Sequence, residues 1–176
     1  PVLEAGKDVL YIAFSSGLSN TYNAAAVAAQ ELNEKYGRQR MLVVDSKCAS
    51  MGQGLLVWLC AQKKAAGASL EALRDYAEET KGHICHWFTV ENLQQLRKGG
   101  RISRTVATLG TMLNIKPVLH IDPDGKIQSI SKARGRENSL KALVDRMAET
   151  AIEPEKQTVF ISHGDCREEA EKVATM

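Results

Sequence analysis

A continuous apolar run, VLYIAF at 9–14, is followed at once by a polar turn and a helix-forming segment, and this succession limits the fold more than any other feature. A short run that is apolar at every position is typical of a strand buried on both faces of a sheet. The same succession recurs at 41–44. Strands that alternate with helices predict an α/β fold with a largely parallel sheet flanked by helices.

The apolar periodicity and the turn residues predict the elements along the whole chain. We expect strands at 9–14, 41–44, 84–90, 115–121, 126–131 and 158–162. We expect helices at 20–36, 51–66, 69–80, 91–97, 104–113 and 137–150, and a last one after 166. Gly37 is expected to end the first helix and Ser69 to cap the third, while the apolar centre of the second helix, 55–60, is expected to be largely buried.

The segment DPDG at 122–125 is a strong turn sequence between two predicted strands, so these strands should form a hairpin with antiparallel pairing. We place a domain boundary near 80–82, which gives a first α/β lobe over 1–81 and a second over 82–176. The chain opens at Pro1 without a methionine and closes within a helical pattern. We therefore expect a piece of a longer protein in which both lobes are truncated.

Composition and charge exclude several classes of function. Lys plus Arg is 23 and Asp plus Glu is 21, so the net charge of +2 does not favour a nucleic-acid partner, and the aromatic content of 5% does not favour base stacking. The four cysteines form no C-x-x-C pair, which argues against a disulfide scaffold or a zinc ribbon. No apolar run approaches the ~18 residues of a membrane-spanning helix. We expect a cytoplasmic protein without a bound metal.

Loops at the carboxyl ends of strands are the first place to look for a binding site, because ligands gather there in open α/β sheets. Three segments fall at such places: 15–22, 45–50 and 162–165. In the first, Ser19 occupies the position of a helix N-cap, and the free N–H groups of a helix N-terminus suit an anion or a carboxylate. An ordinary N-cap without a ligand explains the same residue, so this segment alone leaves both interpretations open.

The segment KGGRIS at 98–103 is the second candidate site. Two adjacent glycines, Gly99 and Gly100, allow successive N–H groups to converge on an anion. Arg101 can bind a carboxylate or a phosphate through two parallel hydrogen bonds, and Ser103 can cap the helix that follows. A flexible turn with solvated basic side chains is the alternative.

Catalytic and metal-binding motifs find little support in the sequence. It contains no G-x-x-x-x-G-K-[ST], G-x-G-x-x-G or G-x-S-x-G motif. His163 and Asp165 are two residues apart, which does not establish the geometry of a catalytic triad. His83, Cys85 and His86 alternate along a predicted strand, so at most two of them face the same side and a metal site is not favoured.

Five segments occur in an order and spacing that resemble the DegV family of fatty-acid-binding proteins: SSGLSNTYNAA, VVDSKCASMGQGLLV, QLRKGGRIS, LNIKPVLHIDPDGKI and ISHGDCREEA. The match extends over essentially the whole chain. The resemblance implies a two-lobed α/β fold that buries one long acyl chain between its lobes and holds the carboxylate near the surface. It also implies a subunit without cofactor or enzymatic activity, which presents a long-chain fatty acid to a separate ATP-dependent fatty acid kinase subunit for phospholipid synthesis.

The same resemblance assigns roles to individual residues. Ser19 is expected to hydrogen-bond the fatty-acid carboxylate, and Arg101 to lie near the carboxylate and to take part in the reaction with the partner. Secondary contributions are expected from Ser16, Gly99, Gly100, Ser103 and His163. Asn20 replaces the glycine that usually follows the family's serine. The family's T-S-x-P and H-x-G-x-G segments have no counterpart here, so two polar contacts to the carboxylate are expected to be missing from this chain.

Other interpretations stay open at this point. An α/β enzyme that acts on a small phosphorylated or carboxylated metabolite would use the same loops without a partner. A structural remnant, whose function is lost with the missing segments, is a third possibility. Lys132, Arg134 and Arg136 form a basic cluster that we interpret as a solvated face, with transient contact to a partner or to an anionic membrane surface as the alternative.

Overall fold

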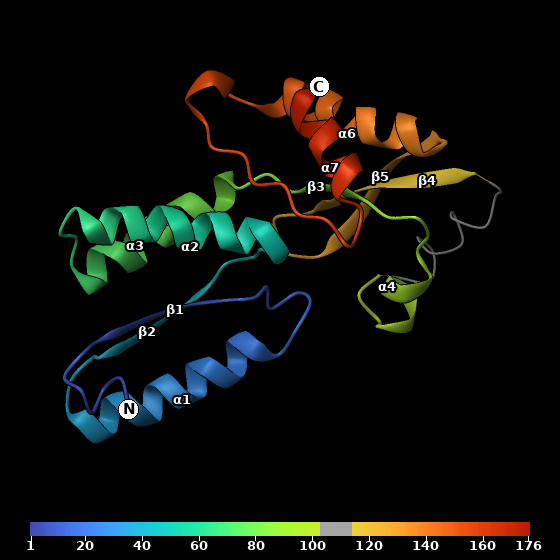
Figure 1. The fold of residues 1–176 in the computed structure, drawn as a ribbon. Coiled ribbons are helices and arrows are strands. Elements are labelled where there is room, and N and C mark those ends of the chain that lie inside the picture. The colour runs from blue at the N-terminus through green and yellow to red at the C-terminus, as the bar shows by residue number, and fades with distance from the viewer. Residues whose placement is uncertain (103–113) are drawn as a thin grey trace. The chain divides into compact units, whose positions relative to one another are not determined.

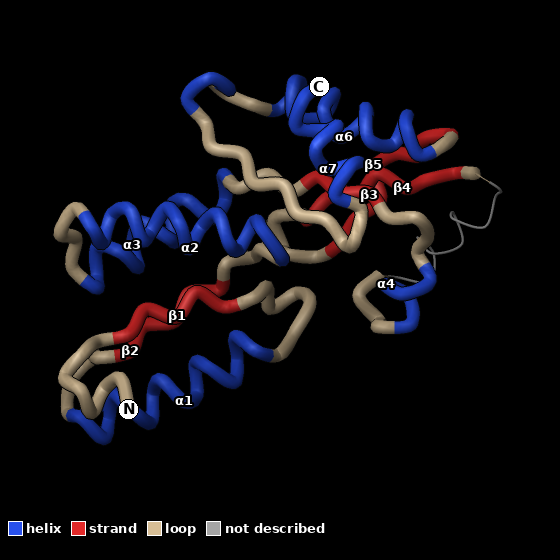
Figure 2. The backbone as a smooth tube through the Cα atoms, viewed as in Figure 1, coloured by secondary structure: helices blue, strands red, loops and turns tan. Residues whose placement is uncertain are grey.

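The computed structural model describes residues 1–102 and 114–176 and shows alternating helices and strands along the chain (Figure 1). The same view coloured by secondary structure separates helices, strands and loops (Figure 2). The predicted α/β class is confirmed. The helix expected at 104–113 and the candidate Ser103 lie outside the described residues.

The chain divides into two compact units, and the division does not follow the sequence strictly. The first unit contains Pro1–Ile84 together with the turn Pro123–Gly125, and the second contains Cys85–Asp122 and Lys126–Met176. The turn that joins two strands of the second unit therefore packs as part of the first.

The first unit is built around two parallel strands. Its elements are β1 (Val9–Ala13), α1 (Thr21–Tyr36), β2 (Met41–Asp45), α2 (Ser50–Ala65), α3 (Leu70–Thr80) and the 3-10 turn η1 (Lys81–His83). Figure 1 shows α1 on one face of the strand pair and α2 with α3 on the other. Both predicted caps are confirmed, since Gly37 ends α1 with a left-handed φ of 64° and the Ser69 side chain accepts the N–H of Ala72 at 3.2 Å.

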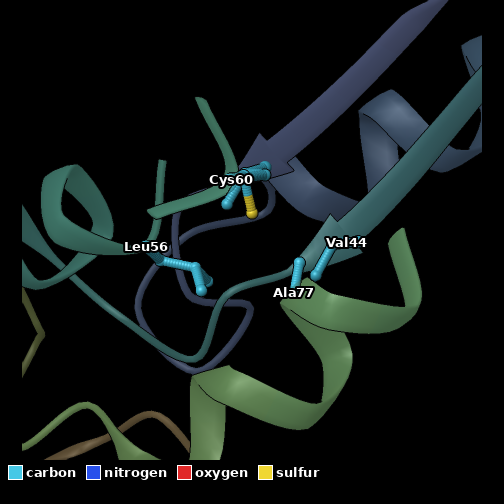
Figure 3. Packing of buried hydrophobic residues seen from close by; sticks show 5 residues of the cluster. Val44, Leu56, Cys60 and Ala77 are labelled. Atoms are coloured by element: carbon cyan, nitrogen blue, oxygen red, sulfur yellow. The ribbon is translucent and has the colours of Figure 1, made fainter. Parts of the chain in front are cut away.

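The core of the first unit lies between the strand pair and the helices α2 and α3 (Figure 3). Ile12 of β1 and Val44 of β2 are register partners, so their side chains lie together on the same face of the pair. The core cluster is completed by residues of both helices: Leu56, Cys60 and Ala77. Burial of these apolar side chains holds the two layers together.

Helix α2 is less buried than its sequence suggests. The segment 55–60 was expected to be largely buried, and Leu56 and Cys60 are, but Val57 is 45% exposed and Trp58 is 39% exposed. The helix packs against β1 and α3, and Leu56 and Cys60 are the residues that it contributes to the core cluster. Apolar composition on every side of a helix therefore does not ensure burial on every side here.

A buried arginine joins the amino-terminal ends of the two strands. Arg40, which precedes β2, donates from Nε to Asp8 Oδ1 at 2.7 Å and from Nη1 to the Leu3 carbonyl at 2.8 Å. Its Nη2 donates to the Lys7 carbonyl at 3.1 Å. The hydrogen bond from Arg40 is the main reason why the pKa of the Asp8 carboxyl lies below its usual value.

The second unit contains a three-stranded sheet. Its elements are β3 (Trp87–Thr89), α4 (Gln94–Lys98), β4 (Ile115–Ile121), β5 (Ile127–Arg134), α6 (Arg136–Thr150), the 3-10 turn η3 (Pro154–Lys156) and α7 (Arg167–Thr175). The strands follow the order β3-β4-β5, and α6 packs against all three. The predicted hairpin is confirmed, because Ile121 pairs with Ile127 across the turn at 122–125.

Two features of the second unit differ from expectation. We expected mostly parallel pairing, which is found for β1 and β2, whereas β3, β4 and β5 pair antiparallel. The short turn between β4 and β5 requires that these two strands run in opposite directions. The predicted strand at 158–162 is not formed, and Val159 and Ile161 are 52% and 43% exposed. Strand formation depends on packing and pairing with neighbouring strands, so residues of high strand propensity do not form a strand by themselves.

Replacement of Leu56 by alanine tests the packing side of α2. Leu56 is fully buried, so Leu56→Ala should lower the free energy of unfolding by about 2–5 kcal/mol. The adjacent Val57→Ala is the matched control and should change it by about 0.5 kcal/mol or less, because Val57 is exposed. Urea unfolding followed by circular dichroism measures both variants. Equal losses would show that α2 packs through a different side.

Candidate functional site

Two of the three predicted loops meet at one edge of the first unit. The Ser15 N–H, just after β1, donates to the Cys48 carbonyl at 2.9 Å, and the Ser46 N–H, just after β2, donates to the Ala13 carbonyl at 3.2 Å. Parallel strands present their carboxyl ends at the same edge, which explains the meeting. The prediction that the segments 15–22 and 45–50 lie at the carboxyl ends of strands is confirmed.

The Asp45 carboxylate, at the end of β2, joins the two loops. Its Oδ1 accepts the N–H of Ser16 at 3.1 Å and the N–H of Lys47 at 3.2 Å. Its Oδ2 lies 2.9 Å from the Lys47 ammonium, which also donates to Ser16 Oγ at 3.0 Å. Burial alone would raise the pKa of Asp45, but the hydrogen bonds from Ser16 and Lys47 outweigh it and hold the pKa below the ordinary 3.8. Asp45 is therefore an ionised, buried link between the loops.

The turn Pro123–Gly125 packs against the loop that follows β1. Ser15 Oγ donates to the Gly125 carbonyl at 2.8 Å and accepts the Gly17 N–H at 3.1 Å. A Cβ atom at Gly17 would lie 2.7 Å from the Gly125 carbonyl oxygen, and a Cβ atom at Gly125 would collide with Ser15 Oγ. Gly125 also has a left-handed φ of 77°. Both positions therefore require glycine.

Ser19 lies at the start of α1 but is not its N-cap, so that prediction was wrong. The N-cap position belongs to Asn20, whose side chain makes no capping hydrogen bond, and the helix begins at Thr21. Ser19 Oγ accepts the Thr21 N–H at 3.3 Å and lies 2.7 Å from the Thr21 hydroxyl. The Ser19 N–H donates to the Ser15 carbonyl at 3.0 Å. Its hydroxyl is thus held beside the first turn of the helix by local contacts.

The glycines of KGGRIS end a helix, and the predicted convergence of their N–H groups on an anion was wrong. The Gly99 N–H donates to the Gln95 carbonyl, and the Gly100 N–H donates to the Arg97 carbonyl at 3.0 Å. The Arg101 N–H donates to the Leu96 carbonyl at 3.0 Å, and Gly100 has a left-handed φ of 71°. This is the Schellman pattern of a helix C-terminus, in which glycine reverses the chain and its neighbours satisfy the last carbonyls.

Arg101 is the last residue of this Schellman motif, and its side chain extends from there. Arg101 is exposed, and its Nη1 donates to the Gly99 carbonyl. The motif therefore fixes the place from which the guanidinium extends. Ser103, the remaining candidate of this segment, lies outside the described residues.

His163 belongs to the second unit and has a local role there. It is exposed, and its Nδ1 accepts the N–H of Cys166, the N-cap residue of α7, at 3.2 Å. The basic cluster of the sequence is divided, since Arg136 pairs with Glu169, with Nε at 2.8 Å from Oε2, whereas Lys132 and Arg134 are exposed on β5.

The described residues offer little for metal or thiol chemistry. Among 1–102 and 114–176, no three His, Cys, Asp or Glu side chains are grouped so that they could hold a metal ion. Burial raises the pKa of the Cys48 thiol to about 12, and the negative charge of Asp45 acts in the same direction, so the thiol stays protonated at neutral pH. Within the same residues, no helix is both long and apolar enough to span a bilayer.

Comparison with known proteins decides the family. The model of the family described as "Uncharacterised protein, DegV family" matches residues 2–176. A DegV domain-containing protein of Clostridium perfringens is 44% identical over 174 residues, which are 99% of this chain and 60% of the relative. The chain belongs to the DegV family. It spans about 60% of the length of that DegV relative.

Solved structures of other DegV proteins share the fold. A DegV family protein from Ruminococcus gnavus, refined with vaccenic acid, aligns with a TM-score of 0.86 at 29% identity over 96% of this chain and 60% of its own. The Streptococcus pneumoniae fatty acid kinase (Fak) B3 protein, loaded with linoleic acid, aligns with a TM-score of 0.76 at 25% identity over 81% of this chain and 51% of its own.

Sequence reasoning predicted a binding role for Ser16 and Ser19 in this loop but missed the groups that hold the loop. Ser15, Gly17, Asp45 and Lys47 received no role of their own, and DPDG was interpreted only as a hairpin turn. The one available signal was a carboxylate at the end of a buried strand, two residues before a lysine. The contact between Ser15 and Gly125 joins residues 110 positions apart and has no local signal.

The glycine at 125 provides a test of the turn's packing. Gly125→Ala should destabilise the protein more than Gly67→Ala, although both glycines have a left-handed φ, because a Cβ at Gly67 meets nothing within 4 Å. The left-handed backbone should cost each variant about 1–2 kcal/mol, and Gly125→Ala should lose about 1–3 kcal/mol more from overpacking. Thermal and urea unfolding measure the difference. Equal losses would show that the turn does not pack against Ser15.

Proposed function

We propose that the protein binds a long-chain fatty acid. The observation that carries the proposal is the membership of the chain in the DegV family together with the fatty acids held by the DegV structures that it resembles, vaccenic acid and linoleic acid. The loop after β1 offers hydroxyl groups beside the start of a helix, where the partial positive charge of the N-terminus favours a carboxylate.

In this proposal, Ser19 donates a hydrogen bond to the carboxylate. Arg101 extends from the Schellman motif and interacts with the carboxylate or with the phosphate groups of a partner. Its planar guanidinium can donate two parallel hydrogen bonds to either group. His163 remains a proposed secondary contact, as does Ser103. Gly99 and Gly100 contribute by fixing the position of Arg101, since their N–H groups are used within the helix end.

The tail and the head group make different contributions to binding. Burial of about fourteen methylene groups yields ~11 kcal/mol of gross driving force at ~0.8 kcal/mol each. Each hydrogen bond to the charged head group adds ~1.5–3 kcal/mol before the costs of association are subtracted. The tail therefore dominates affinity, and the hydroxyl and guanidinium groups orient the carboxylate.

We further propose that the protein presents this carboxylate to a separate ATP-dependent fatty acid kinase subunit in the cytoplasm and is not itself an enzyme. The likeness to the Streptococcus pneumoniae fatty acid kinase B3 protein supports a role within such a system. The sequence contains neither G-x-x-x-x-G-K-[ST] nor G-x-G-x-x-G, the common nucleotide-binding glycine loops. Phosphoryl transfer would then be carried out by the partner, without a cofactor on this chain.

Native mass spectrometry tests fatty-acid binding directly. The protein purified from bacteria should carry a C14–C18 fatty acid, and the delipidated protein should take up added oleate. Ser19→Ala should reduce oleate affinity by about tenfold, because one hydrogen bond to a charged group is lost while the tail contacts remain. Protein that is always free of lipid and takes up no oleate would contradict the proposal.

Arg101→Ala tests presentation to the kinase. Lipid affinity should fall modestly, by ~1–2 kcal/mol, whereas acyl-phosphate formation with ATP and the kinase subunit should fall much further, because phosphoryl transfer depends on charge stabilisation at the reacting oxygen. Arg101→Lys should rescue little of the coupled rate, since a point charge does not replace a bidentate fork. An intact coupled rate in Arg101→Ala would show that this residue is structural. Acyl phosphate formed without the kinase subunit would favour an enzyme instead.

A further inference from the structure

The side chains of Asp45, Lys47 and Ser16 form a closed set of contacts at the edge where the proposed head-group loop begins. The Lys47 ammonium lies 2.9 Å from Asp45 Oδ2 and donates to Ser16 Oγ at 3.0 Å, while Asp45 Oδ1 accepts the backbone N–H groups of both other residues. Asp45 is 7% exposed, and the Lys47 side chain is 34% exposed. The polar groups of this set are thus directed at one another.

The backbone conformation of Lys47 is independent evidence that these contacts hold the loop against the usual φ/ψ preference of a non-glycine residue. Lys47 has a left-handed φ of 55°, a region that non-glycine residues seldom adopt because Cβ crowds the backbone. In this conformation both its N–H and its ammonium return to the same Asp45 carboxylate. Strain of this kind persists where surrounding contacts fix it, and it is concentrated at functional sites.

We propose that Asp45 and Lys47 are a positioning pair that fixes the loop carrying Ser16 and Ser19 for recognition of a carboxylate head group. This inference rests on the proposed fatty-acid binding and names what selects the head group. The pair does not contact the ligand. Its two charges neutralise each other, and Ser16 Oγ accepts a hydrogen bond from Lys47, so we assign the main contact with the carboxylate to Ser19.

The mechanism follows from the connections along the loop. Asp45 accepts the Ser16 N–H, and Lys47 donates to Ser16 Oγ. The carbonyl of the preceding residue, Ser15, accepts the Ser19 N–H at 3.0 Å, so the pair and Ser19 are connected through one short turn. Hydrogen bonds to an anion depend steeply on distance and angle, so small displacements of the loop weaken them. An acyl tail has no such directional requirement. Loss of the pair should therefore weaken binding of the acid and leave binding of an uncharged analogue with the same tail unchanged.

The experiment compares oleate with methyl oleate on delipidated protein by competition against a fluorescent fatty acid. In Asp45→Asn, which keeps the shape but loses the charge that holds Lys47, affinity for oleate should fall about tenfold while affinity for methyl oleate stays the same. Lys47→Gly should give the same selective loss, and it should fold normally because glycine accepts the left-handed backbone. In the Ser19→Ala background, Asp45→Asn should cause no further loss of oleate affinity, because the pair acts through Ser19.

Asp8→Asn is the matched control, because Asp8 also forms a hydrogen-bonded ion pair, with Arg40, but at the other end of the strands. It should lower the melting temperature without changing the preference for the acid. Equal losses for oleate and methyl oleate in Asp45→Asn and Lys47→Gly would overturn the inference, because a purely structural role lowers both. A loss in Lys47→Gly together with unchanged binding in Asp45→Asn would also overturn it, since Lys47 would then contact the ligand itself. If the wild-type protein binds oleate and neither variant changes the preference for oleate over methyl oleate, the positioning pair alone is refuted. If the wild-type protein never binds oleate, the proposed function is refuted as well.

Discussion

The parallel pairing of β1 with β2 is the constraint on which the arrangement of the candidate site depends. Because the two strands run in the same direction, their following loops leave the sheet at the same edge, and Asp45 at the end of β2 can reach N–H groups of both loops. Parallel strands need a crossover between them, which α1 supplies, and the helix start is thereby brought to the same edge. An antiparallel pair would place the two loops at opposite ends.

The elements of the fold were predictable from the sequence because their signals are local. The apolar run at 9–14, the glycine at 37 and the DPDG turn each act within a few residues, and each gave the element that the structure contains. The prediction of a strand at 158–162 was wrong, because strand formation depends on neighbouring strands that the residues of a segment do not specify. The exposure of Val57 and Trp58 likewise depends on what packs against α2 rather than on α2 itself.

The candidate site was predictable only as far as its loops. That 15–22 and 45–50 meet follows from the α/β pattern, but the hydrogen bond between Ser15 and Gly125 joins distant parts of the chain and the role of Asp45 emerges only from geometry. The glycines of KGGRIS show a different difficulty, because paired glycines suit an anion-binding turn and a helix end equally well. Only the acceptors of their N–H groups, which are helix carbonyls, distinguish the two.

A division of labour between tail and head group explains why a binding protein of this kind would keep a strained loop. A long acyl tail supplies most of the affinity without directional contacts, so many molecules with such a tail would bind to a similar degree. Selection among them then rests on a few hydrogen bonds whose strength depends on precise placement. A left-handed Lys47, fixed by a buried carboxylate and a serine, places the loop at a small cost in stability. In a protein that presents a carboxylate to a separate kinase, a fixed loop would also fix the position of the group to be phosphorylated.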